Sequence, residues 1–436
     1  MKDNNKQRRL LALTSILAAL PLSFSTMSAS AETLEERVAR LEAALADTQT
    51  QKEEKSLGKT TYSFGGYIKL DALASKFSGG ERPTSTVGDD FLVPSTIPVG
   101  GESGDANFDM QARHSRIWFK TVTPTEAGNI SSHLEMDFGV NQIGDERISN
   151  SSVTRVRHAF VNWQYDENSS LLAGQTWSTF FNVSTLPETL DFVGPVGTLF
   201  ERQSQVRWTH GLSDGRSLMF AVENPSSGLY GAGGSAAGAS AYDNNALPDI
   251  VLRYNVSTGN VSYSLAALVR EIAYKQDFSN SMAVNISGDD SEIGYGLSFA
   301  AIWKLGADDI KLQLNAGDAL GRYLGIQSYR DGVINDQGDI ELIDQVGGFV
   351  SYRHFWTDKW RSTFVLSASS ADNPDQVAGT TASSYESVHG NLLYSPVKAL
   401  TLGAEFIHAT KNIEAPVNGD DSGDLDRLQF SVKYDF

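Results

Sequence analysis

The sequence contains no cysteine, and this absence removes several kinds of protein at once. Without thiols there is no disulfide framework, thiolate metal site or cysteine nucleophile. Common enzyme signatures are also missing: we find no H-E-x-x-H motif, no G-x-S-x-G motif and no phosphate-binding glycine loop. Basic residues are few, with 35 Lys and Arg against 53 Asp and Glu. A nucleic-acid partner is therefore not expected, because phosphate binding needs a basic face.

Long hydrophobic runs are lacking, apart from one segment near the N-terminus. A basic head is followed by an apolar run from Leu10 to Phe24 and by Ala29-Ser30-Ala31, which is typical of a secretory signal peptide over residues 1–31. An uncleaved anchor fits less well, because Pro21 interrupts the run. Cleavage would remove four basic residues and one acidic residue, and would change the formal net charge from −18 to −21.

The last nine residues alternate without interruption between apolar and polar side chains. Leu428, Phe430, Val432, Tyr434 and Phe436 occupy one parity, and polar residues occupy the other. A strand points successive side chains to opposite faces, so this segment has one apolar and one polar face. A membrane barrel needs such strands, with lipid outside and water inside. One strand alone fits a soluble sheet equally well, so repetition along the chain decides.

The same alternation recurs along the chain, separated by short turns and by longer polar connections. Short turns at one end and long loops at the other are typical of outer-membrane barrels. The pattern predicts an all-β transmembrane antiparallel barrel of about sixteen strands over residues 62–436, with fourteen or eighteen strands left open. Such a barrel encloses an aqueous channel. The longer connections are expected at 78–105, 142–152, 178–203, 225–247, 273–290, 325–341, 370–383 and 411–426.

Residues 32–55 have the pattern of a short coiled-coil helix, followed by a linker over 56–61. Leu34, Val38, Leu41 and Leu45 form an apolar seam, and charged residues flank it. A helix this short is marginal alone and needs partners, which a homotrimer would supply. The alternative is an amphipathic helix lying on the protein's own surface.

The connection over 178–203 is unusually apolar for its length. Folded into the lumen, such a segment packs on the wall and narrows the passage, whereas an external lid or a trimer contact are the alternatives. We expect an inward constriction loop. Its candidate residues are Phe180, Phe181, Glu188, Asp191, Phe192, Phe200 and Glu201.

Strand parity places a set of cations among the lumen-facing residues. Arginine's planar donor fork matches carboxylates, and a ladder of such donors lets an anion exchange water for protein contacts repeatedly. For any one cation, an ion pair with a wall carboxylate such as Glu135 or Asp137 is an equally good interpretation. Arg155 and Arg157 share the parity of lipid-facing positions, which requires a bulge or a place at the rim. The lumen-facing set is Arg116, Lys120, Arg207, Arg253, Arg270, Arg353 and Arg361.

Neither the histidines nor the acidic runs point to a catalytic or metal site. His354 and His408 fall near strand ends, where an interfacial histidine is the simpler interpretation than part of a lipid-cleaving site. The acidic run from Asp420 to Asp426 lacks the ligand spacing of a calcium loop. We therefore expect no cofactor, no metal and no enzymatic activity.

Five segments carry a family resemblance: Leu34-Glu-Glu-Arg-Val-Ala-Arg-Leu-Glu42, Phe64-Gly-Gly-Tyr-Ile-Lys-Leu-Asp-Ala72, Arg113-His-Ser-Arg-Ile-Trp-Phe119, Arg155-Val-Arg-His-Ala-Phe160 and Ala173-Gly-Gln-Thr-Trp-Ser178. With these segments the chain resembles the DcaP-like outer-membrane porins. The resemblance implies a sixteen-stranded trimeric porin whose N-terminal coiled coil reaches into the periplasm. It also implies passage of small anions such as dicarboxylates and aromatic acids.

Together these features predict a porin of the bacterial outer membrane. We expect passive diffusion of small hydrophilic solutes, with a preference for small organic anions. The expected partners are two further copies of the chain, outer-membrane lipid and lipopolysaccharide, and the anionic solutes. The alternatives are a barrel enzyme acting on lipid and a structural or adhesive barrel.

Overall fold

The computed structural model describes most of the chain after residue 54. The expected signal peptide (1–31) and the coiled-coil seam within 32–55 lie outside the described residues. At the start of the described part, β1 (Lys55–Leu57) pairs with the first barrel strand, so the segment expected as a linker already contributes to a sheet. No described helix is long and apolar enough to cross a membrane. The described residues are 55–57, 59–83, 88–139, 142–143, 149, 151–231, 243–279 and 284–436.

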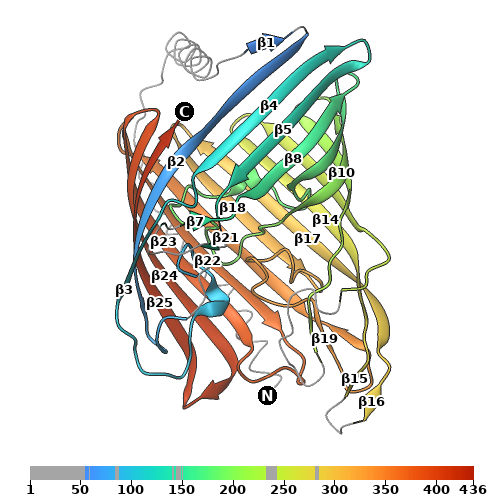
Figure 1. Cartoon of the computed structure of the whole chain (residues 1–436), viewed down its shortest axis with the longest axis vertical. Coiled ribbons are helices and arrows are strands. Elements are labelled where there is room, and N and C mark those ends of the chain that lie inside the picture. The colour runs from blue at the N-terminus through green and yellow to red at the C-terminus, as the bar shows by residue number, and fades with distance from the viewer. Residues whose placement is uncertain are drawn as a thin grey trace.

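Sixteen antiparallel strands form a closed barrel, as the alternation predicted (Figure 1). β3 and β4 are two halves of one barrel strand, because both pair with β2. The strands are β2 (Thr60–Phe77), β3 (Asn107–Gln111) with β4 (Arg116–Thr125), β5 (Gly128–Asp137), β8 (Arg155–Gln164), β9 (Ser169–Trp177), β10 (Arg202–Gly211), β11 (Arg216–Glu223), β13 (Asp249–Thr258), β14 (Val261–Lys275), β17 (Asp289–Leu305), β18 (Asp308–Gly317), β21 (Asp344–Phe355), β22 (Trp360–Asp372), β23 (Ala382–Val397), β24 (Leu400–Val417) and β25 (Asp420–Asp435).

The barrel closes between its first and last strands. β25 pairs with β2 from Tyr67 opposite Asp435 to Phe77 opposite Leu425. The terminal residue completes this seam, because Gly66 and Phe436 exchange two backbone hydrogen bonds of 3.0 Å. A side chain at Gly66 would clash with the Arg116 carbonyl, only 2.1 Å from the added carbon. The closed seam leaves no open strand edge in lipid.

The two faces of each strand follow the predicted alternation. On the outer face, Ile68, Leu297 and Phe430 expose 56%, 59% and 54% of their surface, as expected of side chains that meet hydrocarbon. On the inner face, Asp71 and Gln429 are fully buried. Polar residues are therefore enclosed, and apolar residues cover the wall.

A bulge resolves the parity conflict of Arg155 and Arg157. The register between β5 and β8 shifts, so that Glu135 lies opposite His158 while Met136 lies opposite Val156. Val156 consequently points outward, and both arginines point inward onto lumen carboxylates. The extra residue re-aims the strand, as bulges do.

One end of the barrel has short turns, and the other carries long connections. We number the connections from the N-terminus and take the end with the short turns as the periplasmic side. The expected loop over 411–426 is wrong: β24 and β25 extend through it and meet at Asn418-Gly419, both at positive φ. The acidic residues placed in that loop therefore lie on a strand. The connections are 78–106 (first), 138–154 (second), 178–201 (third), 224–248 (fourth), 276–288 (fifth), 318–343 (sixth), 373–381 (seventh) and 418–419 (eighth).

Reversing the environment of single positions tests the assignment of faces. Val206 lies near the middle of β10 and is 49% exposed on the outer wall. We expect Val206→Arg to lower the free energy of unfolding of the barrel in a bilayer by about 2–4 kcal/mol, because a cation would face hydrocarbon. Denaturant titration in lipid vesicles measures this quantity. Thr209→Arg on the inner face of the same strand is the control, and an equal loss in both variants would contradict the assignment.

Candidate functional site

The third loop lies inside the barrel and contacts side chains of the inner wall at two separate places. Arg253 of β13 donates hydrogen bonds to the Thr179 and Phe181 carbonyls at 3.1 and 3.0 Å. Further along the loop, the Leu190 carbonyl accepts from Lys69 of β2 at 2.8 Å and from Gln429 of β25 at 3.1 Å. Wall side chains thus hold the loop at both places, because its backbone groups need partners once they are enclosed.

Glu188 fastens the third loop to the wall near the periplasmic end. Its carboxylate accepts hydrogen bonds from Arg361 Nε at 3.0 Å, from Arg361 Nη2 at 2.6 Å and from Arg353 Nη1 at 3.0 Å. Burial raises the pKa of Glu188, but the hydrogen bonds and charges of Arg361 and Arg353 outweigh burial, so the pKa lies below its ordinary value. Arg353 also pairs with Asp309. Arg353 and Arg361 therefore form ion pairs with carboxylates, as the alternative interpretation of the sequence had it.

The remaining candidates of this loop hold it together more than they line a passage. Phe180, Phe181 and Phe200 are buried in one apolar cluster. Asp191 is also buried, and its carboxylate accepts the Leu92 N–H at 2.7 Å, which ties the third loop to the first. Phe192 is half-buried and stacks on His114, with ring centroids 4.6 Å apart.

Glu201 sits at the end of the third loop. Burial raises the pKa of Glu201 to about 7, and the Arg322 and Arg202 charges act in the opposite direction. Its Oε1 lies 3.8 Å from Arg322 Nη2. The contact connects the third loop with the sixth, so this carboxyl group belongs to the packing of the loops.

The sixth loop also folds into the lumen, which the sequence analysis missed. Its Tyr323 and Leu324 are buried in the same cluster as Phe180 and Leu199 of the third loop. The Tyr323 hydroxyl donates to Asp249 at 2.6 Å. Leu92 and Ile97 of the first loop join this cluster from the other side. Three loops therefore share one apolar core inside the barrel.

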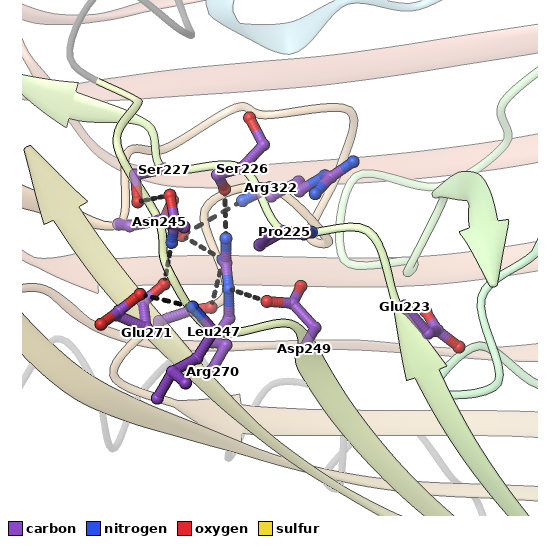
Figure 2. A network of polar contacts seen from close by, with 12 residues as sticks. Glu223, Pro225, Ser226, Ser227, Asn245, Leu247, Asp249, Arg270, Glu271 and Arg322 are labelled. Atoms are coloured by element: carbon purple, nitrogen blue, oxygen red, sulfur yellow. Dashed lines mark hydrogen bonds and ion pairs between the residues drawn. The ribbon is translucent and has the colours of Figure 1, made fainter. Parts of the chain in front are cut away.

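Arg270 is the anchor of the sixth loop, and Figure 2 shows its surroundings. This side chain is 1% exposed on β14 and donates to Asp331 at 2.8 Å and to the Ala319 carbonyl at 3.0 Å. It also lies 3.5 Å from Asp249 and donates to the Ser226 carbonyl of the fourth loop. Arg270 was predicted as a solute contact, but its guanidinium group is enclosed by these partners and serves the packing.

A cluster of four arginines lies on the inner wall formed by β4, β8 and β10, and only Arg116 among them was predicted as a solute contact. We call Arg116, Arg155, Arg157 and Arg202 the arginine cluster. Arg155 forms a bidentate pair with Asp137 at 2.8 and 2.9 Å. Arg157 donates to Glu135 at 2.8 Å and to Asp137 at 3.0 Å, and Arg116 lies 3.3 Å from Glu135.

Arg202 adds a charge that no carboxylate in the described part of the chain pairs with. Its guanidinium lies 4.3 Å from the Trp177 ring centroid and 5.4 Å from that of Phe200. Its Nη1 is buried and has no hydrogen-bond partner among the described residues. Four guanidinium groups therefore surround the two carboxylates of Glu135 and Asp137, which leaves an excess of two positive charges.

Burial shows where water can pass beside the loops. On the side covered by the loops, the inward residues Val365, Tyr385 and Ile407 are at most 1% exposed. On β4 the inward Arg116, Trp118 and Lys120 keep intermediate exposure, as does His133 on β5. The loops thus fill one side of the lumen, and the arginine cluster borders the other. Lys120 lies there over the Trp118 ring at 4.8 Å.

The sequence pattern of the family described as DcaP outer membrane protein matches residues 35–436. The chain belongs to this family. The solved structure of the outer membrane channel DcaP of Acinetobacter baumannii is similar, with a TM-score of 0.70 and 21% identity over 88% of this chain and 99% of that one. The OmpT outer membrane protein of Vibrio cholerae aligns with a TM-score of 0.53 and 11% identity over 88% of this chain and 100% of that one. No curated protein sequence gives a significant match.

Family membership and barrel geometry agree on the general nature of the molecule. This DcaP-family chain is an outer-membrane barrel of the porin type, located in the bacterial outer membrane. The structural likenesses lie below 25% identity, so they establish the fold only.

Loosening the third loop of this DcaP-family barrel should change the channel current. In Glu188→Gln the ion pairs to Arg353 and Arg361 lose their negative partner, so we expect a larger and noisier single-channel current. Acid should have the same effect on the wild type. The pKa of Glu188 is lowered, so its ion pairs are complete above the ordinary carboxyl pKa and are lost as the pH falls through the lowered pKa. Planar-bilayer recordings at neutral pH and at about pH 3 measure both effects.

Glu386→Gln is the matched control, because Glu386 is exposed on the outer wall of β23. It should leave the neutral-pH current unchanged. A Glu188→Gln channel as quiet as the wild type at neutral pH would show that these ion pairs do not hold the loop.

Removing Arg270 should destabilise the whole barrel. Arg270→Met leaves Asp331 and Asp249 buried without their cation, which costs about 3–5 kcal/mol. Urea unfolding in detergent micelles measures the loss. Arg216→Met, which removes an exposed arginine, is the comparison. A loss below about 1 kcal/mol, typical of an exposed ion pair, would contradict the anchoring role.

Proposed function

We propose that the protein is a water-filled channel through which small hydrophilic solutes diffuse passively, with a preference for small organic anions such as dicarboxylates and aromatic acids. The observation that carries this proposal is the arginine cluster, with its excess of two positive charges beside the open part of the lumen. Fixed charges lining a pore raise the local concentration of counter-ions and lower the barrier to their passage.

The geometry of the arginine cluster suits carboxylates in particular. Guanidinium groups present paired donors that match a carboxylate, whereas an ammonium is a point charge. Phe192 lies against the cluster, with its ring centroid 5.6 Å from Arg155 and 5.2 Å from Arg157. The acidic total of the chain does not oppose this, because the charge that matters is the local one.

The two histidines considered for lipid cleavage, His354 and His408, pair with carboxylates. His354 bonds to Asp308 at 2.8 Å and to Tyr352 at 3.2 Å. His408 bonds to Asp426 at 2.8 Å and to Thr410 at 3.5 Å. Neither has a serine among its hydrogen-bond partners in the described part of the chain, so no Ser-His arrangement for cleaving lipid forms around them.

The preference for anions can be measured as a reversal potential across a planar bilayer under a potassium chloride gradient. We expect the wild type to favour chloride. Arg155→Gln removes a partly exposed member of the cluster while Arg157 still pairs with Asp137, so it should reduce the chloride-to-potassium permeability ratio by roughly two- to five-fold. Arg216→Gln, at the exposed periplasmic rim, should leave the ratio unchanged. A wild-type channel that favours potassium would refute the anion preference.

We also propose that the protein works as a homotrimer joined partly by residues 32–55. OmpT of Vibrio cholerae, which shares the fold at a TM-score of 0.53, has been solved in a trimer form. Three copies would give the seam of Leu34, Val38, Leu41 and Leu45 the partners that a short helix needs. Contacts with outer-membrane lipid and lipopolysaccharide follow for any barrel in this membrane.

Deleting residues 32–55 should weaken the trimer while the barrel itself stays folded. Native gels report the oligomer, and resistance of the barrel to unfolding in cold detergent reports the fold. Trimers of undiminished stability after the deletion would refute this role of the segment.

A further inference from the structure

A separate cavity lies on the periplasmic side of the third loop. Its volume is about 540 Å³, within the usual range for small-molecule sites. It is enclosed by the third loop and by the short-turn ends of β10, β11, β13, β14 and β17. Its lining includes Arg207, Arg253, Ser217, Asn255 and Ser257.

Two arginines from different strands face this cavity, and neither forms an ion pair among the described residues. Arg253 donates to the Thr179 and Phe181 carbonyls through one nitrogen, while its buried Nε has no hydrogen-bond partner there. Arg207 has neither a hydrogen bond nor an ion pair in the described part of the chain, although it is half-buried. Both guanidinium groups line the same cavity, so their positive charges repel each other.

The nearest carboxylate is already engaged elsewhere. Glu223 accepts the Thr179 N–H at 2.7 Å and the Gln203 amide at 2.5 Å. It offsets the two arginine charges in part, but its oxygens serve the third loop and not the arginines. Two enclosed cations with free donors are costly unless an anion can join them.

We propose that this cavity is a second anion-binding site, distinct from the arginine cluster, which takes a small organic dianion entering from the periplasmic side. The assignment rests on the proposed channel function and deepens it. Two guanidinium groups supply the counter-charge for two carboxylates, and Ser217, Asn255 and Ser257 add neutral hydrogen-bond donors. A monoanion would leave one guanidinium group without a partner, so it binds more weakly.

A site of this kind makes permeation saturable and unequal from the two sides. Solutes arriving from the periplasm meet the cavity before the third loop, whereas solutes from outside must first pass the arginine cluster. Succinate added on the periplasmic side should therefore reduce the potassium chloride current with a lower half-blocking concentration than succinate added on the other side. Acetate at equal ionic strength should block far less.

The test uses the full-length protein in planar bilayers, with succinate as the probe and Arg207→Gln as the variant. Arg207 makes no hydrogen bond or ion pair with another described residue, so the substitution breaks no such contact. Losing one charged hydrogen-bond partner should raise the half-blocking concentration on the periplasmic side roughly tenfold. Arg207→Lys keeps the charge and should recover part of the loss. Arg216→Gln removes the same charge at the exposed end of β11 outside the cavity and should have no effect.

The outcomes separate the site from the channel function. If the wild type favours chloride but Arg207→Gln and Arg216→Gln block like the wild type, the cavity is not a binding site while the channel proposal stands. Equal shifts in both variants would mean that net charge at the rim acts, and this too would overturn the site. If the wild type shows no anion preference and no succinate block, the channel proposal and the site fall together.

Discussion

Hydrocarbon cannot satisfy a backbone N–H or C=O group, and the architecture follows from that single constraint. The chain must return its last strand to its first, and it does so along β2 and β25 until Gly66 and Phe436 exchange their hydrogen bonds. Closure fixes the alternation, because every side chain then faces either lipid or lumen. Without inward-folded loops, the polar lumen of a sixteen-stranded barrel is an open aqueous channel. The loops that fold into the lumen therefore set its permeability.

Three loops from the extracellular end fill one side of that space. Their shared core of aromatic and aliphatic residues is built as in a soluble protein, by removing apolar surface from water. Ion pairs then fix the loops to the wall, through the half-buried Glu188 for the third and the buried Arg270 for the sixth. Removing one partner of the buried pair would destabilise the barrel, because the other charge would stay enclosed without a counter-charge. The other side keeps its water, and the excess positive charge lies there.

The strands were predictable because their signal is local. Side chains alternate with period two wherever lipid and lumen face each other, and this period reads directly from the residues. The long hairpin over 411–426 was not, because polar residues occupy both faces of β24 and β25 beyond the lipid and resemble a loop. The inward fold of the third loop was visible in its apolar composition, and Leu320, Tyr323 and Leu324 carry the same signal for the sixth. The partners of each arginine depend on a bulge and on contacts far apart in the chain, as for Arg157 and Arg270, so composition could not separate ion pairs from free charges.

Because the chain has no cysteine, single cysteines can report which parts of the lumen water reaches. The most direct measurement compares the rate at which a negatively charged thiol reagent modifies a cysteine at Lys120, on the open side, and at Val365, on the side covered by the loops, in the assembled protein in lipid. We expect fast modification with loss of channel current for Lys120→Cys, and no modification for Val365→Cys. Equal rates at the two positions would contradict a passage confined to the side of the arginine cluster.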